Sequence, residues 1–155
     1  MIELNISKRN KLNAESRWKK IQYQEEQYIK NNKNKFLNLK SRLFGYLAGD
    51  GNILIGNGIS NFHHTVRFFP DHESMIQPFC KAFDKIYNKI PKVKKLQNHY
   101  LLSVDSKIVV KDIINSAKFG VLNWKVPHGL LYNKENKKEW LRAFLIVKAM
   151  LVKTT

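Results

Sequence analysis

The chain has a single cysteine and no long apolar run. Cys80 is the only cysteine among the 155 residues, which excludes an internal disulfide and fits a reducing compartment. No apolar stretch approaches the roughly 20 residues that a membrane span needs. The first residues lack the basic and then apolar layout of a secretion signal. Together these absences predict a soluble protein of the cytoplasm.

Acidic residues are also scarce. Asp and Glu number 12 against 28 Lys and Arg, which gives a formal charge of +16 and a pI near 10.0. Such an excess points first to nucleic acid, whose phosphates attract the cations and release counterions on binding. An anionic membrane surface is the second interpretation. A lysine-rich composition from A+T-rich coding, without any function, is the third.

What the chain does have is a short apolar run that ends in an acid. The run, LFGYLAGDG, begins at Leu43 and ends at Gly51. Gly45 and Gly49 are four apart, so they share a helix face and would let a second helix approach closely. Asp50 falls at the negative end of the helix dipole, which costs a carboxylate about 0.3–1 kcal/mol. A bound cation would explain it; an ordinary helix end before a turn is the alternative.

The hydrophobic periodicity predicts an α+β domain in which helices alternate with antiparallel hairpins. The expected elements are a helix over Leu39–Asp50, strands at Asn52–Ile55 and Thr65–Phe69 around a Gly56-Asn57-Gly58 loop, a helix opened by Ser74 and stopped by Pro91, strands at Val93–Leu96 and Tyr100–Val104, a helix over Ser106–Phe119 ended by Gly120, and a last helix from about Lys134.

Residues 1–38 form a polar and basic N-terminal extension. Apolar residues recur at helical spacing from about Ala14 to Lys30, so we expect a helix there and a loop at Lys33–Lys35. The segment Glu3–Arg9 resembles the turn and second-helix start of a helix-turn-helix. A basic tail with a helical patch is the alternative interpretation.

The run at residues 43–51 resembles the signature helix of the LAGLIDADG (DOD-type) homing endonucleases, and archaeal proteins of this type in particular. Leu43 takes the first position of that motif, Gly45 the third, Asp50 the penultimate acid and Gly51 the last. The resemblance covers roughly residues 37–148. It implies an αββαββα half domain over 39–132, whose saddle-shaped sheet lies in the DNA major groove, and a second motif helix in 133–155.

The resemblance also implies chemistry. Family members hydrolyse DNA phosphodiester bonds at long specific sites with Mg²⁺ or another divalent cation. Asp50 would be the metal carboxylate, the Gly49 carbonyl a co-ligand, and Lys107 a basic residue of the active site. Leu43, Gly45, Leu47 and Gly49 would pack the motif helix against a second one. Because single-motif members dimerise through this helix, a homodimer is one expectation.

Four basic residues lie on or beside the expected hairpins and are candidates for contacts with double-stranded DNA: Arg67, Lys92, Lys94 and Lys95. Strand alternation places Lys92 and Lys94 on one face, suited to phosphates or guanine edges. An ordinary solvated surface is the alternative.

The second motif of two-motif members would begin at Leu141. Counting on, the acid position falls on Lys148 and the glycine on Ala149, so neither fits and the site is half built. Lys148 suits a helix C-terminus but repels a divalent cation. A shift of reading frame near Phe144 is one explanation. An intact short protein with an apolar last helix is the other.

Other chemistry finds less support. His63, His64 and His72, with Cys80 or His99, match no standard zinc spacing. The sequence contains no phosphate loop, dinucleotide fingerprint or nucleophile elbow. It also lacks an intein splicing signature, which favours a freestanding reading frame over a splicing element, and an association with introns or inteins is expected from the resemblance. A non-catalytic DNA-binding regulator or relic, and a basic RNA-binding protein, are the rival functions.

Overall fold

The computed structural model describes residues 2–56, 63–119 and 124–151, with side chains from 5 to 149 within those ranges. Its helices and strands follow the expected order. They are α1 (Ile2–Asn32), α2 (Leu37–Asp50), β1 (Gly51–Ile55), β2 (His64–Phe68), the short 3-10 helix η1 (Glu73–Met75), α3 (Ile76–Tyr87), β3 (Lys92–Lys95), β4 (Tyr100–Asp105), α4 (Lys107–Ser116) and α5 (Lys134–Leu151). From α2 to α4 the order is αββαββα, which confirms the α+β prediction.

The four strands form one antiparallel sheet in the order β1-β2-β4-β3. Each hairpin supplies one inner strand, so β2 pairs with β4 at the centre and the two hairpins lie side by side. In this pairing Phe68 is opposite Leu102, and Val66 is opposite Val104. All four side chains are buried. Since neighbouring residues of a strand point to opposite faces, the residues between them occupy the other face.

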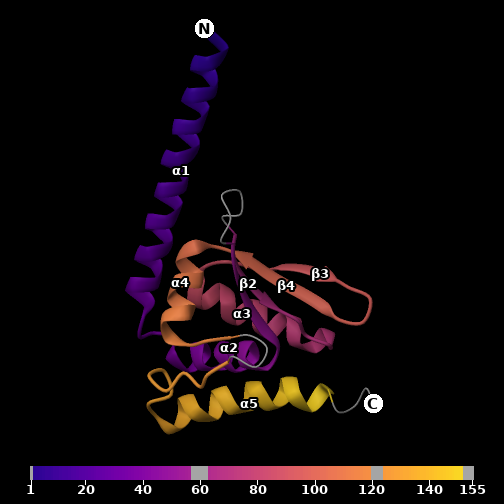
Figure 1. Ribbon diagram of the computed structural model, residues 1–155. Coiled ribbons are helices and arrows are strands. Elements are labelled where there is room, and N and C mark those ends of the chain that lie inside the picture. The colour runs from indigo at the N-terminus through magenta and orange to yellow at the C-terminus, as the bar shows by residue number, and fades with distance from the viewer. Residues whose placement is uncertain (1, 57–62, 120–123, 152–155) are drawn as a thin grey trace.

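The helices cover one face of this sheet and leave the other open. Figure 1 shows α3 and α2 beneath the sheet, with α5 below α2. Aromatic rings fill the space between sheet and helices: Phe68 of β2 stacks on Phe79 of α3 with centroids 4.5 Å apart. Tyr46 of α2 lies 5.8 Å from the ring of Phe68. One contiguous core therefore joins the central strands to α2 and α3.

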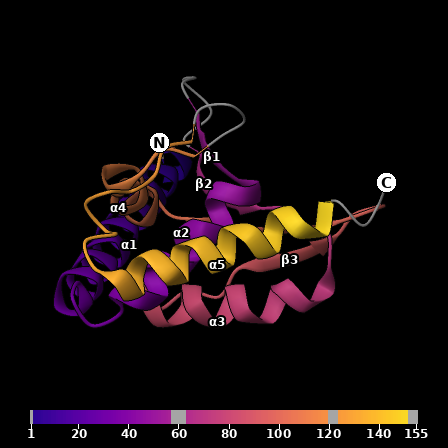
Figure 2. The same cartoon turned by 90° about the horizontal axis from the view of Figure 1, so that it is seen from below.

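Helix α5 packs along α2 with almost no space between the backbones. A Cβ added at Gly45 would come within 2.3 Å of the carbonyl oxygen of Trp140, and one added at Gly49 within 2.5 Å of the side chain of Val147. Figure 2 shows α5 running past α2 on the underside of the molecule. The helix that the two glycines admit therefore comes from this same chain.

The N-terminal extension differs from expectation. Helix α1 is continuous from Ile2 to Asn32, so the turn proposed within Glu3–Arg9 is wrong. The first half of α1 was missed because the cue was apolar periodicity, which requires a packed face. That half is polar instead, yet its sequence contains no Pro or Gly to interrupt a helix. The turn at residues 33–36 includes the expected loop.

Several element ends also shifted. Helix α4 ends at Ser116 and not at Phe119, and Ser106 caps it by accepting a hydrogen bond from the Val109 amide at 3.1 Å. The helical segment opened by η1 is capped by His72 and not by Ser74. The loop at residues 57–58 and the stop at Gly120 lie outside the described residues. No helix among those described is long and apolar enough to span a membrane.

Candidate functional site

Asp50 stands at the end of α2, where the chain passes directly into β1. Gly51 makes this junction, but in an extended conformation with φ −96° and not in the left-handed one expected of a helix-terminating glycine. Its missing side chain matters for space: a Cβ there would lie 2.4 Å from the carbonyl oxygen of Leu47. The Asp50 carbonyl then accepts a hydrogen bond from the Phe69 amide at 3.0 Å, which ties the helix end to the end of β2.

Helices α2 and α5 run parallel with a nearly constant sequence offset of 97 to 99 residues. Arg42 binds Glu139, 97 residues further on, and Gly49 contacts Lys148, 99 residues further on. Such a fixed separation arises only when two helices run in the same direction. Their C-terminal ends therefore lie together, and both helix dipoles present their negative ends there. The place next to Asp50 attracts a cation for this reason.

The cation that occupies this place is the side chain of Lys148. Its Nζ donates a hydrogen bond to the carbonyl oxygen of Gly49 at 2.8 Å. The same Nζ lies 3.7 Å from Oδ1 of Asp50, which makes a salt bridge. The two groups that the sequence offered as metal ligands, the Asp50 carboxylate and the Gly49 carbonyl, are thus both engaged by an ammonium group of the chain itself.

The surroundings of Asp50 weaken its acidity. Burial raises the pKa of the Asp50 carboxyl above its ordinary value, the Lys148 ammonium opposes that rise, and the carboxylate of Asp71 adds to it. The carboxylate is half-buried, and Lys148 is its only close positive partner among the described residues, so burial outweighs the ion pair.

The residues present do not fit a divalent metal centre. Magnesium takes near-octahedral oxygen coordination, usually from one or two carboxylates together with substrate phosphates and waters. Across residues 2–56, 63–119 and 124–151, no group of three His, Cys, Asp or Glu side chains is placed to hold a metal ion. A divalent ion would also have to displace the Lys148 ammonium from both of its contacts.

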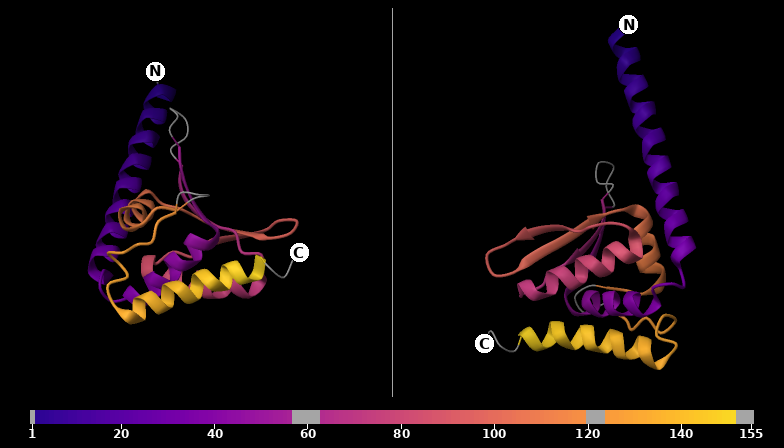
Figure 3. Two further views of the ribbon diagram at one scale, coloured as in Figure 1. Left: turned by 60° about the horizontal axis from the view of Figure 1, so that its bottom comes forward. Right: turned by 180° about the vertical axis from the view of Figure 1, so that it is seen from behind.

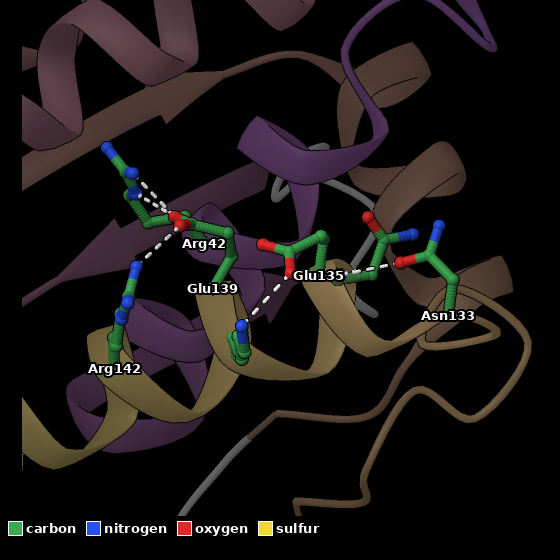
Figure 4. Close-up of polar contacts among 7 residues, drawn as sticks. Arg42, Asn133, Glu135, Glu139 and Arg142 are labelled. Atoms are coloured by element: carbon green, nitrogen blue, oxygen red, sulfur yellow. Dashed lines mark hydrogen bonds and ion pairs between the residues drawn. The ribbon is translucent and has the colours of Figure 1, made fainter.

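A polar network that sequence reasoning missed sets the register of the two helices. Figure 4 shows Arg42 of α2 pointing toward Glu139 of α5, with Arg142 on the other carboxylate oxygen. The Arg42 Nε donates to Glu139 Oε2 at 2.6 Å, and the Arg142 guanidinium lies 3.3 Å from Oε1. Asn133 opens α5 by accepting from the Asn136 amide at 2.8 Å. Glu139 and Lys148 are on the same helix, a little over two turns apart. The contact of Glu139 with Arg42 therefore helps to set the position of Lys148 beside the end of α2.

The open face of the sheet carries a row of polar residues that crosses all four strands. Strand pairing sets Asn52 opposite Arg67, Arg67 opposite Ser103, and Ser103 opposite Lys92. The neighbours of these residues along β2 and β4 are buried, so alternation turns the row to the face away from the helices. Lys94 shares this face, opposite Leu101.

Arg67 is the centre of that row. Its Nη2 donates to Asn52 Oδ1 at 3.4 Å, and its guanidinium lies 5.7 Å from the ring centroid of Phe69. Its Nε is buried and has no hydrogen-bond partner among the described residues, which leaves a donor unused. Lys95 differs from the other candidates: it pairs with Tyr100 on the opposite face, 6.0 Å from that ring centroid.

Lys107 is placed away from Asp50. It is the first residue of α4, next to Ser106, whose amide donates to the His64 carbonyl at 2.9 Å. Asp50 is tied to Phe69, beyond the other end of β2. Five residues of extended strand separate these two points by roughly 17 Å. Lys107 instead lines a cavity of about 540 Å³ between α1 and the start of α4, together with Trp18 and His64.

The fold, with its paired parallel helices, is that of an α+β domain similar to the LAGLIDADG homing endonucleases. Solved structures of the homing endonuclease I-DmoI share this fold. Mesophilic variants of that enzyme are 16% identical with a TM-score of 0.56, over 74% of this chain and 63% of that chain. No protein-family model and no curated protein sequence matches the chain.

Two further solved structures show I-DmoI with DNA and a metal. The complex with DNA and Mn is 17% identical with a TM-score of 0.52, over 72% of this chain and 62% of that one. The complex with DNA and Ca is 17% identical with a TM-score of 0.56, over 72% of this chain and 57% of that one. The chain thus spans about three fifths of the length of the proteins it matches. At such identity the likeness establishes the fold.

Proposed function

We propose that this chain binds double-stranded DNA with the open face of its four-stranded sheet. The observation that carries the proposal is the continuous row Asn52, Arg67, Ser103 and Lys92, whose donors face away from the helices. Arginine, asparagine and lysine are the side chains that read base edges in the major groove. The formal charge of +16 supplies the attraction to phosphates. The I-DmoI complexes with DNA support the same partner.

We further propose that a single chain binds this DNA without cutting it. Hydrolysis of a phosphodiester needs a metal to activate water and to stabilise the leaving oxygen. The I-DmoI structures contain Mn or Ca beside DNA. Here Mg²⁺ would find only Asp50 and the Gly49 carbonyl among the described residues, and both are bound by Lys148. The function is therefore that of a DNA-binding protein on an endonuclease scaffold.

The homodimer expected of a single-motif protein is not part of this proposal. Pairing through the motif helix would use the face that carries Gly45 and Gly49, and α5 already covers that face. A second copy would first have to displace α5. The cytoplasmic location is proposed from the single cysteine, Cys80, which fits a reducing compartment. A kinship with archaeal-like proteins associated with introns or inteins is proposed only from the resemblance of residues 43–51.

Binding is tested on a pool of randomised duplexes, because the target site is unknown. Selection by the full chain should enrich one sequence family, and its affinity should fall with salt in proportion to the phosphates contacted. Arg67→Ala should weaken binding to the selected duplex by about 1–3 kcal/mol and reduce sequence specificity at one base position. Lys81→Ala, an equal loss of charge on the exposed side of α3, is the matched control.

Two results would contradict the proposal. Failure of the pool to enrich any sequence would leave only non-specific attraction. Equal or tighter binding to RNA of the same length would point to the rival, RNA-binding function. Cleavage is tested separately, by incubating a plasmid that carries the selected site with Mg²⁺ or Mn²⁺. We expect no nicking. Nicking that Asp50→Asn abolishes would overturn the non-catalytic part alone.

A further inference from the structure

Helix α1 consists of an anchored half and a free half. The anchored half is tied to the domain by side chains. Glu25 accepts a hydrogen bond from Ser106 at 2.5 Å and pairs with Lys89 at 2.5 Å, and the Tyr28 hydroxyl donates to the Lys85 carbonyl at 2.8 Å. Every residue from 5 to 20 is exposed. Within this free half Trp18 lines the cavity shared with α4, so the part beyond that cavity is residues 5–17, about 20 Å long at 1.5 Å per residue.

The free half has no apolar face with which to dock on a protein or a membrane. The large exposed apolar side chains between residues 5 and 20 are Ile6, Leu12 and Trp18. They are six residues apart, so each is turned about 240° from the one before it and the three point in different directions. A coiled-coil partner or a membrane surface requires a continuous apolar stripe. Without such a stripe this helix would neither form a coiled coil nor insert an apolar face into a membrane.

The charge of the free half is strongly one-sided. Between residues 5 and 20 it carries six cations and one acid, Glu15; the cations are Lys8, Arg9, Lys11, Arg17, Lys19 and Lys20. Lys8 and Lys19 are eleven residues apart, as are Arg9 and Lys20, so each pair lies on one side of the helix about 16 Å apart. These rows of like charge destabilise a bare helix and suit a polyanion laid along it.

The free half also points toward the DNA side of the molecule. Figure 1 shows α1 rising past the sheet on the side away from α5, and the two views of Figure 3 agree. The open face of the sheet is on this side. A duplex seated on the sheet and continuing past its edge would therefore run near the free half.

We propose that the free half of α1 is an arm that binds the phosphate backbone of duplex DNA flanking the site contacted by the sheet. This inference rests on the proposed DNA-binding function. A helix of this length without packing is marginal in water, so neutralisation of its cations by phosphates both orders the arm and adds affinity. The arm contributes no base readout, because its cations would meet backbone and not base edges.

The test uses the full chain and the selected duplex, with and without 15 additional flanking base pairs. The arm variant is Lys8→Gln, Arg9→Gln, Lys11→Gln. Its matched control is Lys81→Gln, Lys111→Gln, Lys137→Gln, three exposed lysines outside α1. We expect the arm variant to shorten the hydroxyl-radical footprint on one side. The slope of log affinity against log salt should fall by about 0.9 for each phosphate that the variant no longer neutralises.

The outcomes separate the arm from the sheet. Equal footprints and equal salt slopes for the arm variant and the unchanged chain would overturn the arm while leaving DNA binding by the sheet intact. The control triple should keep the full footprint, and an equal shortening there would overturn the arm as well. Absence of any specific binding by the unchanged chain would overturn the proposed function, and the arm with it.

Discussion

The Nζ of Lys148 lies 3.7 Å from Oδ1 of Asp50, at the meeting point of two helix C-termini. The geometry there is that of a cation site, because two negative helix ends and a carboxylate converge. The cation is covalently part of the chain. The ammonium group of Lys148 thus balances the negative ends of α2 and α5 and the Asp50 carboxylate.

Replacing that lysine with an acid should create divalent-ion binding. In Lys148→Asp the two carboxylates would face each other beside the Gly49 carbonyl, and we expect at least tenfold tighter binding of Mn²⁺ than in the unchanged chain, measured by titration calorimetry. Oxygen ligands of like charge suit such an ion. Lys148→Met removes the ammonium without adding a ligand and is the control. Equal Mn²⁺ affinity in the Asp and Met variants would show that Lys148 only blocks the ion.

The raised pKa of Asp50 makes stability depend on pH. A carboxyl with a higher pKa in the folded chain binds its proton more tightly when folded, so its contribution to stability falls as pH rises from its ordinary value of 3.8 to the raised one. Asp50→Asn should lack this fall. The free energy of unfolding in urea, measured across that range, tests it. Glu135→Gln, at an exposed carboxylate of α5, is the control and should follow the unchanged chain.

An NMR titration can separate the effect of the ion pair on the pKa of Asp50 from the effect of burial. Because the Lys148 ammonium lowers the pKa of Asp50 against the effect of burial, Lys148→Met should raise that pKa further. The carboxyl carbon shift of Asp50 in an NMR titration gives the value directly. A pKa that does not move would mean that the two side chains are not paired in solution.

The close packing of α2 on α5 makes Gly45 highly sensitive to substitution. In Gly45→Ala the new Cβ meets the backbone oxygen of Trp140, which cannot move without shifting α5. We expect an overpacking cost of about 1–3 kcal/mol, reduced by up to about 1 kcal/mol of helix propensity. Gly129→Ala is the control, because apart from the glycine itself and its two chain neighbours no heavy atom of the described residues lies within 4 Å of the added carbon. Equal urea midpoints for both variants would mean that the helices are not packed this closely.

Sequence reasoning predicted the fold because local signals agreed with it. The glycines of α2, the capping Ser106 and the alternation of the strands each depend on a few neighbouring residues. The features that could not be predicted depend on the distances between residues that are far apart in the sequence. The separation of Lys107 from Asp50 follows from the length of β2. A list of candidate active-site residues does not give this distance. The contact of Lys148 with Gly49 follows from the offset between α2 and α5, which Arg42 and Glu139 help to set.

The helical first half of α1 was missed for a different reason. Apolar periodicity records packing, and residues 5–20 are exposed throughout. Their helix is encoded only by the absence of breaking residues and by many moderate helix formers. Such a signal is too weak to predict a helix from one sequence, although it is enough to continue a helix that Glu25 and Tyr28 already hold in place.

The offset between α2 and α5 also has a consequence for biosynthesis. Helix α2 is complete once Asp50 has left the ribosome, but the residue that completes its partner face lies about 98 positions later. At about 5–20 residues per second, the glycine face of α2 stays uncovered for roughly 5–20 seconds in each nascent chain. During that interval neighbouring chains on one messenger expose the same face to each other.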